Sequence, residues 1–392
     1  MYTSISYWLS QALWEDAAVN FRENKMNFSI SRDVLLKPLQ LVAGVVEKRQ
    51  TLPILANVLM VVDGDQLSLT GTDLEVEMMG RVKLQNHSSS MEITVPAKKL
   101  LDICKSLPDG ADIKFSLEDQ KLIVKSGRSK FSLSSLAAND FPCVEEGDEA
   151  LQFSVKQAEL RRLLDRTSFA MAQQDVRYYL NGMLWQVVGN KFITVATDGH
   201  RLAKCELSTD TEIGTLQKVI VPRKGVIELA RLLSDDNAHV QITIGANHVR
   251  ATTESFTFTS KLVDGKFPDY ERVLPKGGSK VIYGVRNELK QAFNRTAILS
   301  NEKYRGVRLL LSDGSMKMVA NNPEQEEAEE VVSVDYHGEV LEIGFNVSYL
   351  VDVLGVLSGE NTRITLSDSN SSALLEESDG GDSVYVIMPM RL

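Results

Sequence analysis

Three stretches of the chain repeat one pattern, and they read FSISRDVLLKPLQLV from Phe28, FSVKQAELRRLLDRTSFAM from Phe153 and YGVRNELKQAFNRTAILS from Tyr283. Each stretch begins with a short alternating run, which predicts a strand, and continues with apolar residues at helical spacing. The three starts lie 125 and 130 residues apart. A period of this length is the size of a small domain and is longer than the period of a solenoid repeat.

A second block recurs in the same order, and it reads TVPAKKLLDICKSLP from Thr94, IVPRKGVIELARLLS from Ile220 and GFNVSYLVDVLGVLS from Gly344. Pro96 and Pro222 lie 126 residues apart, and Asn346 takes the equivalent place 124 residues further on. Because proline suits the start of a helix, the block predicts a second helix in each unit. The agreement of these ordered anchors indicates a triplicated unit.

Between the predicted helices lie alternating runs such as DIKFSL, KLIVKS and KFSLSS, which predict antiparallel strands, with Asp63-Gly64 and Asp313-Gly314 as turns. Each unit is therefore expected to be an α+β domain with two helices and antiparallel sheets, in which the helices cover only one sheet face. A chain of 392 residues is too long for one ordinary core. The predicted boundaries are an extension over 1–25 and three domains over 26–150, 151–275 and 276–392.

The composition is typical of a globular protein, with 43% hydrophobic and 24% charged residues. No run approaches the roughly 20 apolar residues that a membrane span needs. The cysteines, Cys104, Cys143 and Cys205, are far apart and odd in number, which predicts a reduced, cytoplasmic protein without disulfides. The net charge of −10 argues against nucleic acid as a partner unless cations gather where phosphates would lie.

Cations do gather on five of the six predicted helices, all except the last. Scattered Lys and Arg usually form a solvated helix face, but their recurrence in an acidic protein favours a sequence-independent attraction to phosphates. On the first helix of each unit they are Arg32, Lys37, Lys156, Arg161, Arg162, Arg166, Arg286, Lys290 and Arg295. On the second helices they are Lys98, Lys99, Lys105, Arg223, Lys224 and Arg231.

Several stretches are nearly identical to those of a known family, among them TLPILANVL from Thr51, SLTGTDLEVEM from Ser68, QDVRYYLNGM from Gln174, ATDGHRLA from Ala196, AILSNEKYRGVRL from Ala297 and the C-terminal VIMPMRL. From Met26 to Leu392 the chain resembles the bacterial DNA sliding clamp, the β subunit of DNA polymerase III. The resemblance implies a non-enzymatic processivity factor without cofactors. It also implies a head-to-tail homodimer of three-domain chains, a six-domain ring that encircles duplex DNA.

The resemblance further implies which residues contact DNA, and they are Arg49, Lys98, Gln174, Tyr178 and Tyr179. Lys98 stands where the family also has arginine, so the charge is kept but the bidentate fork is lost. Taken alone, Tyr178 and Tyr179 would be interpreted as core or strand residues.

The family has an apolar pocket that takes short linear peptides from the polymerase III catalytic subunit, the clamp loader, other DNA polymerases and repair proteins. By resemblance it is lined here by Leu180, Thr197, Gly199, His200, Arg201, Leu202, Pro268, Arg272, Val273, Asn346, Tyr349, Ser372, Met388, Pro389, Met390 and Arg391. Methionine suits a pocket with several partners because its side chain adapts to each. Taken alone, the C-terminal Met-Pro-Met would more often be simple packing.

Two oppositely charged segments predict how the dimer closes. The basic segment, in the first unit, is Lys121, Lys125, Arg128 and Lys130, and Lys99 is assigned to the same interface. The acidic set, in the third unit, is Glu324, Glu326, Glu327, Glu329 and Glu330. Complementary charge would guide head-to-tail assembly, and Ile298 and Leu299 match family positions that pack in this interface. The alternative is that both segments are ordinary solvated surfaces.

Other functions have weaker support in the sequence. Asp198-Gly199-His200-Arg201 could suggest acid–base catalysis, but no serine or cysteine nucleophile stands beside it in a known motif. The five histidines lack metal-ligand spacing, so no metal is expected, and neither GxxxxGK[ST] nor GxGxxG occurs. ATP would then be hydrolysed by a separate loading machine. The alternatives are a nucleic-acid-modifying enzyme on the same repeat and an interaction scaffold that never encloses DNA.

Residues 1–25 have no counterpart in the resemblance and do not have the features of a secretory signal. The simplest expectation is a disordered extension. The alternative is a partner-binding helix, because one set of apolar residues falls at helical spacing, namely Ile5, Trp8, Leu9, Ala12 and Leu13.

Overall fold

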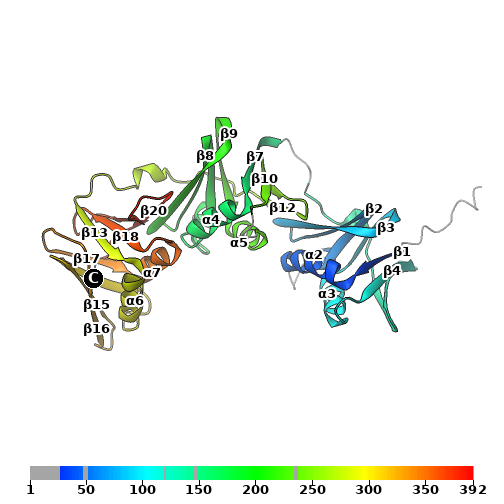
Figure 1. Ribbon diagram of the computed structural model, residues 1–392, viewed down its shortest axis with the longest axis horizontal. Coiled ribbons are helices and arrows are strands. Elements are labelled where there is room, and N and C mark those ends of the chain that lie inside the picture. The colour runs from blue at the N-terminus through cyan, green and yellow to red at the C-terminus, as the bar shows by residue number, and fades with distance from the viewer. Residues whose placement is uncertain (1–26, 47–51, 119–120, 145–148, 234–236, 392) are drawn as a thin grey trace, which may run out of the picture. The chain divides into compact units, whose positions relative to one another are not determined.

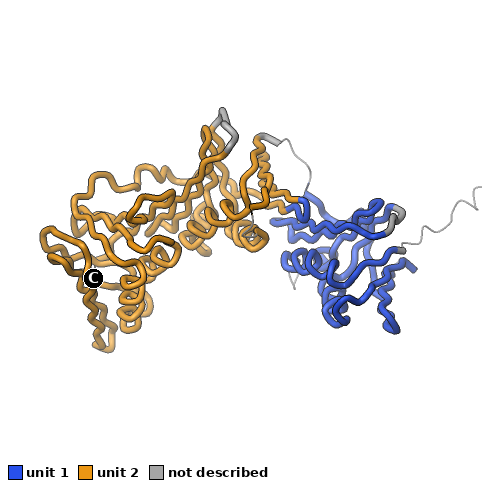
Figure 2. Tube along the Cα trace, viewed as in Figure 1, with its two compact units in different colours: residues 1–144, 254–257 blue, residues 145–253, 258–392 orange. Residues whose placement is uncertain are grey.

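The computed structural model describes residues 27–46, 52–118, 121–144, 149–233 and 237–391. The expected extension over 1–25 and the candidate DNA contact Arg49 lie outside these ranges. The chain divides into two compact units (Figure 2), of which unit 1 holds residues 1–144 and 254–257 and unit 2 holds residues 145–253 and 258–392. The first repeat therefore lies in unit 1, and most of the second and all of the third lie in unit 2.

Unit 1 begins with the predicted strand and helix of the first repeat, β1 (Asn27–Ser31) and α2 (Arg32–Val45). It continues with β2 (Asn57–Thr72), β3 (Val76–Pro96), α3 (Ala97–Ser106), β4 (Asp112–Glu118), β5 (Lys121–Ser126) and β6 (Ser129–Ser134). β2 and β3 form a long antiparallel pair, and a four-stranded antiparallel sheet has the order β1-β4-β5-β6.

The second repeat follows the same plan, with β7 (Glu149–Lys156), α4 (Gln157–Ser168), β8 (Gly182–Thr197), β9 (Arg201–Pro222), α5 (Arg223–Leu232), β10 (His239–Gly245), β11 (His248–Thr252) and β12 (Phe256–Lys261). The third has β13 (Lys280–Val285), α6 (Arg286–Ala297), β14 (Gly306–Ser312), β15 (Ser315–Asn321), β16 (Glu327–Ser333), β17 (Leu341–Asn346), α7 (Val347–Val356), β18 (Asn361–Leu366), β19 (Ala373–Glu377) and β20 (Ser383–Ile387). Six α-helices in the described ranges form the pairs α2/α3, α4/α5 and α6/α7 (Figure 1). The prediction of two helices and antiparallel strands per repeat is confirmed.

The second and third repeats share one sheet in unit 2, whose strand order is β13-β18-β19-β20-β9-β8. β20 of the third repeat pairs antiparallel with β9 of the second, with Val386 opposite Leu202 and Ile387 opposite Arg201. A second sheet of the third repeat has the order β16-β15-β14-β17, so β16 is an edge strand, as β6 is in unit 1. None of the described helices is long and apolar enough to cross a membrane.

Two details of the sequence prediction need correction. Asp313-Gly314 does form the turn between β14 and β15, but Gly64 lies inside β2, where the register with β3 shifts. The φ of Gly64 is +61°, and β2 continues through the Asp-Gly pair instead of ending there in a hairpin turn, while the extra residues at the register shift lie in β3. Pro96 and Pro222 were expected to be the first residues of helices. They are instead the last residues of β3 and β9, and each helix begins at the next residue.

The helices bury the residues that their spacing predicts. Leu35, Leu39 and Val42 of α2 are fully buried, and so are Leu100 and Cys104 of α3. In the second repeat, the core is aromatic, with the Phe192 ring 5.2 Å from Phe153 and 5.3 Å from Trp185 in edge contacts. The first repeat also buries an aromatic pair, the stacked rings of Phe28 and Phe115, whose centres lie 4.8 Å apart.

The first residue of the first helix ties each helix pair together. The backbone N–H groups of Arg32, Gln157 and Arg286 donate to Ala111, Ala238 and Glu360, which lie beyond the second helix of the same repeat. In the third repeat the Arg286 guanidinium also donates to carbonyls at the end of α7, those of Leu354 (3.2 Å), Leu357 (2.9 Å) and Gly359 (2.9 Å). A cation at a helix C-terminus satisfies the last carbonyls and complements the helix dipole.

Replacing Arg286 with methionine should therefore destabilise the third repeat, since three carbonyls lose their donor while the apolar stem is kept. We expect a loss of about 2–3 kcal/mol in the free energy of unfolding, measured by urea denaturation followed by circular dichroism. Asn294→Ala, at an exposed position of the same helix, is the control and should shift it by less than about 0.5 kcal/mol. Equal stability of the Arg286 variant and the wild type would contradict the role of these bonds.

Candidate partner pocket, DNA-facing residues and strand edges

Arg201 is the central side chain of the candidate partner pocket. Its Nε lies 3.1 Å from Asp198 Oδ2, its Nη1 lies 2.5 Å from Asp352 Oδ2, and its Nη2 donates to the Phe169 carbonyl at 2.8 Å. The guanidinium also lies 4.4 Å from the centre of the Tyr349 ring. Asp352 and Tyr349 belong to α7 of the third repeat, so Arg201 joins the second and third repeats by ion-pair and cation–π contacts.

Asp198 forms the turn between β8 and β9. Its Oδ1 accepts hydrogen bonds from the backbone N–H groups of His200 (2.9 Å) and Arg201 (3.0 Å), and its Oδ2 pairs with the Arg201 side chain. Gly199 has φ +92°, a conformation that favours glycine. The Asp198 carboxylate is thus engaged in holding the Asp-Gly-His-Arg turn and the Arg201 side chain.

The C-terminal segment after β20 completes this region. The Met388 N–H donates to the His200 carbonyl at 2.9 Å, and the Met390 N–H donates to the Gly344 carbonyl at 2.8 Å. The segment therefore bonds to the second repeat at one point and to the third repeat at the next. Met388 remains 41% exposed, so a flexible apolar side chain is available at the surface beside Arg201.

Apolar residues underlie the same region. Leu202 packs in a buried cluster with Phe267, Tyr270 and Val386, and Tyr179 and Leu274 pack against it. Val273 remains 37% exposed next to this cluster in the sequence. The cluster lies where β20 of the third repeat pairs with β9 of the second.

The remaining predicted pocket residues differ in their contacts and in how far they are exposed. Asn346 caps α7 by accepting from the Ser348 N–H at 2.9 Å, and Arg272 pairs with Asp269 at 2.8 Å while staying 85% exposed. Thr197 donates to the Arg201 carbonyl at 2.6 Å. The others range from buried to exposed, namely Leu180 (buried), Pro268 (exposed), Ser372 and Pro389 (half-buried) and Arg391 (exposed).

Sequence reasoning did not identify Phe169 and Asp352, both of which hold Arg201. The available signal for Asp352 was that it is the one charged residue of α7, a helix that is otherwise apolar or neutral. Phe169 contributes its backbone carbonyl at the end of α4, which no side-chain pattern could reveal.

The described candidate DNA contacts, except Lys98, lie in the segment before β8. Asp175 stabilises this segment. Its carboxylate accepts hydrogen bonds from the Arg177 backbone N–H at 2.8 Å and from the Arg177 guanidinium at 2.8 and 3.0 Å. The bonds from Arg177 lower the pKa of Asp175 to about 2. Gln174 is exposed with φ +55°, and Tyr178 is 57% exposed, its ring 5.9 Å from that of Tyr179. Gln174 and Tyr178 thus lie at the surface, contrary to the core reading of Tyr178, whereas Tyr179 is half-buried against the Leu202 cluster.

Most arginines of the predicted basic helices are engaged within the protein, which corrects the sequence interpretation. Arg166 of α4 pairs with Glu377 (3.1 Å) and Asp382 (3.0 Å) of the third repeat, and Arg162 also pairs with Asp382. Burial opposes ionisation of Asp382, but the Arg162 hydrogen bond and the nearby arginine charges outweigh it and lower its pKa. Arg32, Arg231, Arg286 and Arg295 likewise bond to carboxylates or carbonyls.

The lysines behave differently. Lys37, Lys98, Lys99, Lys105 and Lys156 are exposed, and no ion pair within the described residues engages them. Since an arginine fork forms multiple directed bonds while a lysine carries a compact charge on a flexible stem, this division is physically expected. The helix cations free to meet a polyanion are therefore mainly lysines.

The candidate interface residues lie at or near the two edge strands. Lys121 and Lys130 are on β5 and β6, and Arg128 is in the turn between them, whereas Lys99 is on α3. Of the acidic set, Glu329 pairs with Lys317 (2.8 Å) and Glu330 with Arg295 (2.6 Å). Glu324, Glu326 and Glu327 are exposed, as is Ile298 at 74%, while Leu299 is half-buried.

The chain matches one family over nearly its whole length. Residues 26–145, 154–269 and 271–391 match, in order, the N-terminal, central and C-terminal domains of the DNA polymerase III beta subunit. The beta sliding clamp of Pseudomonas aeruginosa is 66% identical over 367 residues, which are 94% of this chain and 100% of that protein. The beta sliding clamp of Vibrio cholerae is 53% identical, also over 94% of this chain and 100% of that protein.

Solved structures agree with this. The crystal structure of the DNA polymerase III subunit beta from Pseudomonas aeruginosa superimposes with a TM-score of 0.92, at 66% identity, over 94% of this chain and 100% of that one. A second Pseudomonas aeruginosa structure, with the same TM-score of 0.92 and the same coverage, is of a sliding clamp bound to griselimycin. The fold and site thus define a three-domain clamp subunit. The chain belongs to the DNA polymerase III beta subunit family, the beta sliding clamps, and is a non-enzymatic processivity factor of DNA replication.

The division between arginines and lysines can be tested with one variant of each kind. Arg166→Gln should lower the free energy of unfolding by about 2 kcal/mol because it breaks two ion pairs of a nearly buried guanidinium. It should leave unchanged the salt dependence of binding to a short DNA duplex, measured as the slope of log K against log salt concentration.

Lys98→Gln should reduce the magnitude of this slope by about one and leave the free energy of unfolding unchanged.

Fluorescence anisotropy at several salt concentrations measures DNA binding, and thermal denaturation measures stability.

The loss of stability caused by Arg166→Gln should also depend on pH. Since the pKa of Asp382 is lowered in the folded protein, its pairing contributes stability above its ordinary pKa of 3.8 and loses it as pH falls through the lowered value. A reduced salt slope for Arg166→Gln would show that this arginine contacts phosphate, and the division would be wrong.

Proposed function

We propose that two copies of this chain close head to tail into a six-domain ring around duplex DNA, where the ring tethers the replicative polymerase in the cytoplasm. The main support for this ring is that two four-stranded sheets each end in an edge strand, β6 in the first repeat and β16 in the third. An open edge presents unpaired N–H and C=O groups, which another strand can satisfy. Pairing β6 of one chain with β16 of the next would satisfy both edges and close the ring.

Charge and apolar surface support the same pairing. The β6 edge carries Lys130 with Lys121 and Arg128 close by in the sequence, and the β16 segment carries exposed Glu324 and Glu327. Opposite charges steer association and fix register more than they add affinity. An interface also needs an apolar core, and the third repeat exposes a set of large apolar side chains near β16, namely Ile298 (74%), Val331 (60%) and Tyr304 (58%).

Inside such a ring the exposed lysines would face the phosphates. Their attraction to DNA is independent of base sequence, and it permits sliding because no base edge is read. Gln174, Tyr178 and Tyr179 would add contacts from the segment before β8, and Arg49 from outside the described residues. The weak, distributed contacts explain how an acidic protein can hold DNA without being fixed on it.

The pocket around Arg201 would take short linear peptides from the polymerase III catalytic subunit, the clamp loader, other DNA polymerases and repair proteins. It offers the apolar cluster around Leu202 together with the adaptable Met388 and Met390. Two ends of the pocket belong to different repeats, which the C-terminal segment and Arg201 hold together. The site can therefore be shaped before a partner arrives, which limits the entropy lost on binding.

The scaffold alternative is separated from the ring by topology. After loading by a clamp loader with ATP, the protein should stay on circular DNA through a salt wash and be lost when the circle is cut, because a ring can slide off an end. Gel filtration of labelled protein with DNA measures this retention. Equal loss from circular and linear DNA would favour a scaffold that does not enclose DNA.

Closure of the dimer can be tested at Ile298. Ile298→Asp should raise the dimer dissociation constant by about a hundredfold, since it places a charge in an apolar contact while the folded monomer already exposes this side chain. Sedimentation velocity over a concentration series measures the constant. Val340→Asp is the matched control, because Val340 is equally exposed, at 76%, but lies outside β16 and its turn. An unchanged constant for Ile298→Asp would show that dimers form through another surface.

A further inference from the structure

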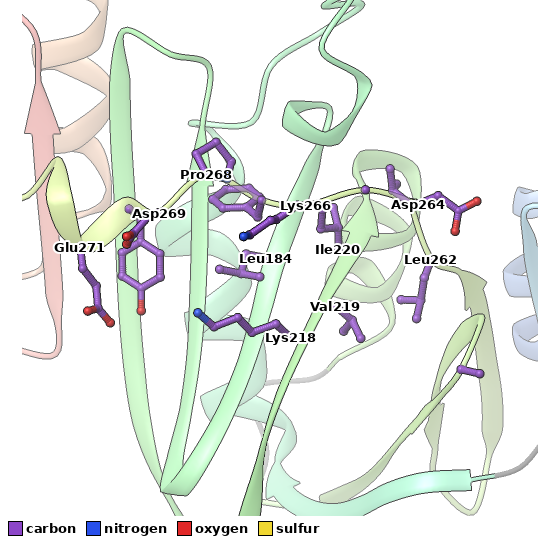
Figure 3. A pocket seen from close by; sticks show the side chains of 15 residues that line it. Leu184, Lys218, Val219, Ile220, Leu262, Asp264, Lys266, Pro268, Asp269 and Glu271 are labelled. Atoms are coloured by element: carbon purple, nitrogen blue, oxygen red, sulfur yellow. The ribbon is translucent and has the colours of Figure 1, made fainter.

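A second hollow lies beside the candidate partner pocket in unit 2 and has no assigned role. It has a volume of about 610 Å³ and is bounded by β8, β9 and the segment 262–271 (Figure 3). Its apolar floor includes Leu184, Ile220, Phe267 and Tyr270, which belong to the same buried cluster as Leu202. The hollow and the candidate partner pocket thus lie over the same buried apolar cluster.

Two lysines extend into this hollow. Lys218 comes from β9 and Lys266 from the crossing segment, and Figure 3 shows both amines turned into the hollow over Leu184. Both side chains are exposed, and neither forms an ion pair with any residue in the described ranges. Two like charges that converge on one hollow repel each other, and a bound anion would relieve that repulsion.

Several charged side chains near these two lysines already form ion pairs. Lys191 and Lys204 both pair with Glu206, each at 2.6 Å. Asp269, which also lines the hollow, pairs with Arg272 at 2.8 Å. Lys218 and Lys266 thus form no ion pair within the described ranges, although the exposed carboxylates Asp264 and Glu271 also line the hollow.

The hollow adjoins the residues of the candidate partner pocket. Pro268 lines the hollow and is also one of the residues assigned to the peptide pocket by resemblance. Phe267, on one side of it in the chain, packs in the cluster that contains Leu202 and Val386. A peptide seated on the partner pocket has only to extend past Pro268 to place its next residues over Lys218 and Lys266.

We propose that this hollow, the lysine hollow, receives acidic side chains that flank the clamp-binding peptide of a partner protein. The proposal rests on the proposed peptide pocket and adds a charge preference to it. A peptide is favoured over DNA because exposed carboxylates, Asp264 and Glu271, also line the hollow. They would repel a continuous chain of phosphates, whereas one or two carboxylates can fit between them over the lysines.

The test uses the full chain and fluorescent synthetic peptides that contain the clamp-binding segment of a polymerase III catalytic subunit. One peptide carries Asp-Glu-Asp before the segment, one carries it after, and matched peptides carry Asn-Gln-Asn. The acidic flank at one end should tighten binding about fivefold at low salt, and salt should weaken this gain. Lys218→Gln with Lys266→Gln should abolish the gain and leave the neutral-flank peptides unaffected.

Lys261→Gln is the control, since Lys261 is exposed, lies just before the same segment and does not line the hollow. It should retain the full gain. No gain from an acidic flank at either end, or a gain that survives the double substitution, would overturn the proposal. So would a double variant that loses affinity for a DNA duplex but not for acidic peptides. Failure of every peptide to bind the wild type would instead contradict the peptide pocket itself.

Discussion

The pairing of β20 with β9 is the contact on which the functional part of the molecule depends. It makes one six-stranded sheet out of two repeats and places Ile387 opposite Arg201. From that register the C-terminal segment reaches the His200 carbonyl, and the α7 side chains Tyr349 and Asp352 reach the Arg201 guanidinium. Because strand register has a period of two, a slip of one residue would turn the pocket side chains to the opposite face.

Electrostatics divides the cations into two groups with separate tasks. Arginines such as Arg166 and Arg286 form several directed bonds each, and they hold helices to sheets and repeats to one another. Lysines such as Lys98 remain free at the surface, where a mobile point charge suits contact with a sliding polyanion. This division explains how a chain with a net charge of −10 can belong to a DNA clamp family.

The repeat made the fold accessible from sequence, because Phe28, Phe153 and Tyr283 mark equivalent strands, each followed by a helix that the apolar spacing predicted. Contacts between residues distant in the chain were not accessible. Arg166 was read as a DNA-facing cation because its partner, Asp382, lies 216 residues away. Asp63-Gly64 was read as a turn because local chemistry does not reveal that β2 continues through it. The pocket residues came from resemblance, and although Asp352 is the one charged residue of α7, its contact with Arg201 is evident only in the packed structure.

The proposed function depends on the chain forming a closed ring of two copies on DNA. Electron cryo-microscopy of the protein loaded on a short duplex with blocked ends tests this ring most directly. A closed ring should appear as two chains around one duplex, with β6 of each chain antiparallel to β16 of the other and the duplex inside the hole. A single chain on the duplex, or DNA bound outside a dimer whose β6 and β16 edges remain unpaired, would contradict it.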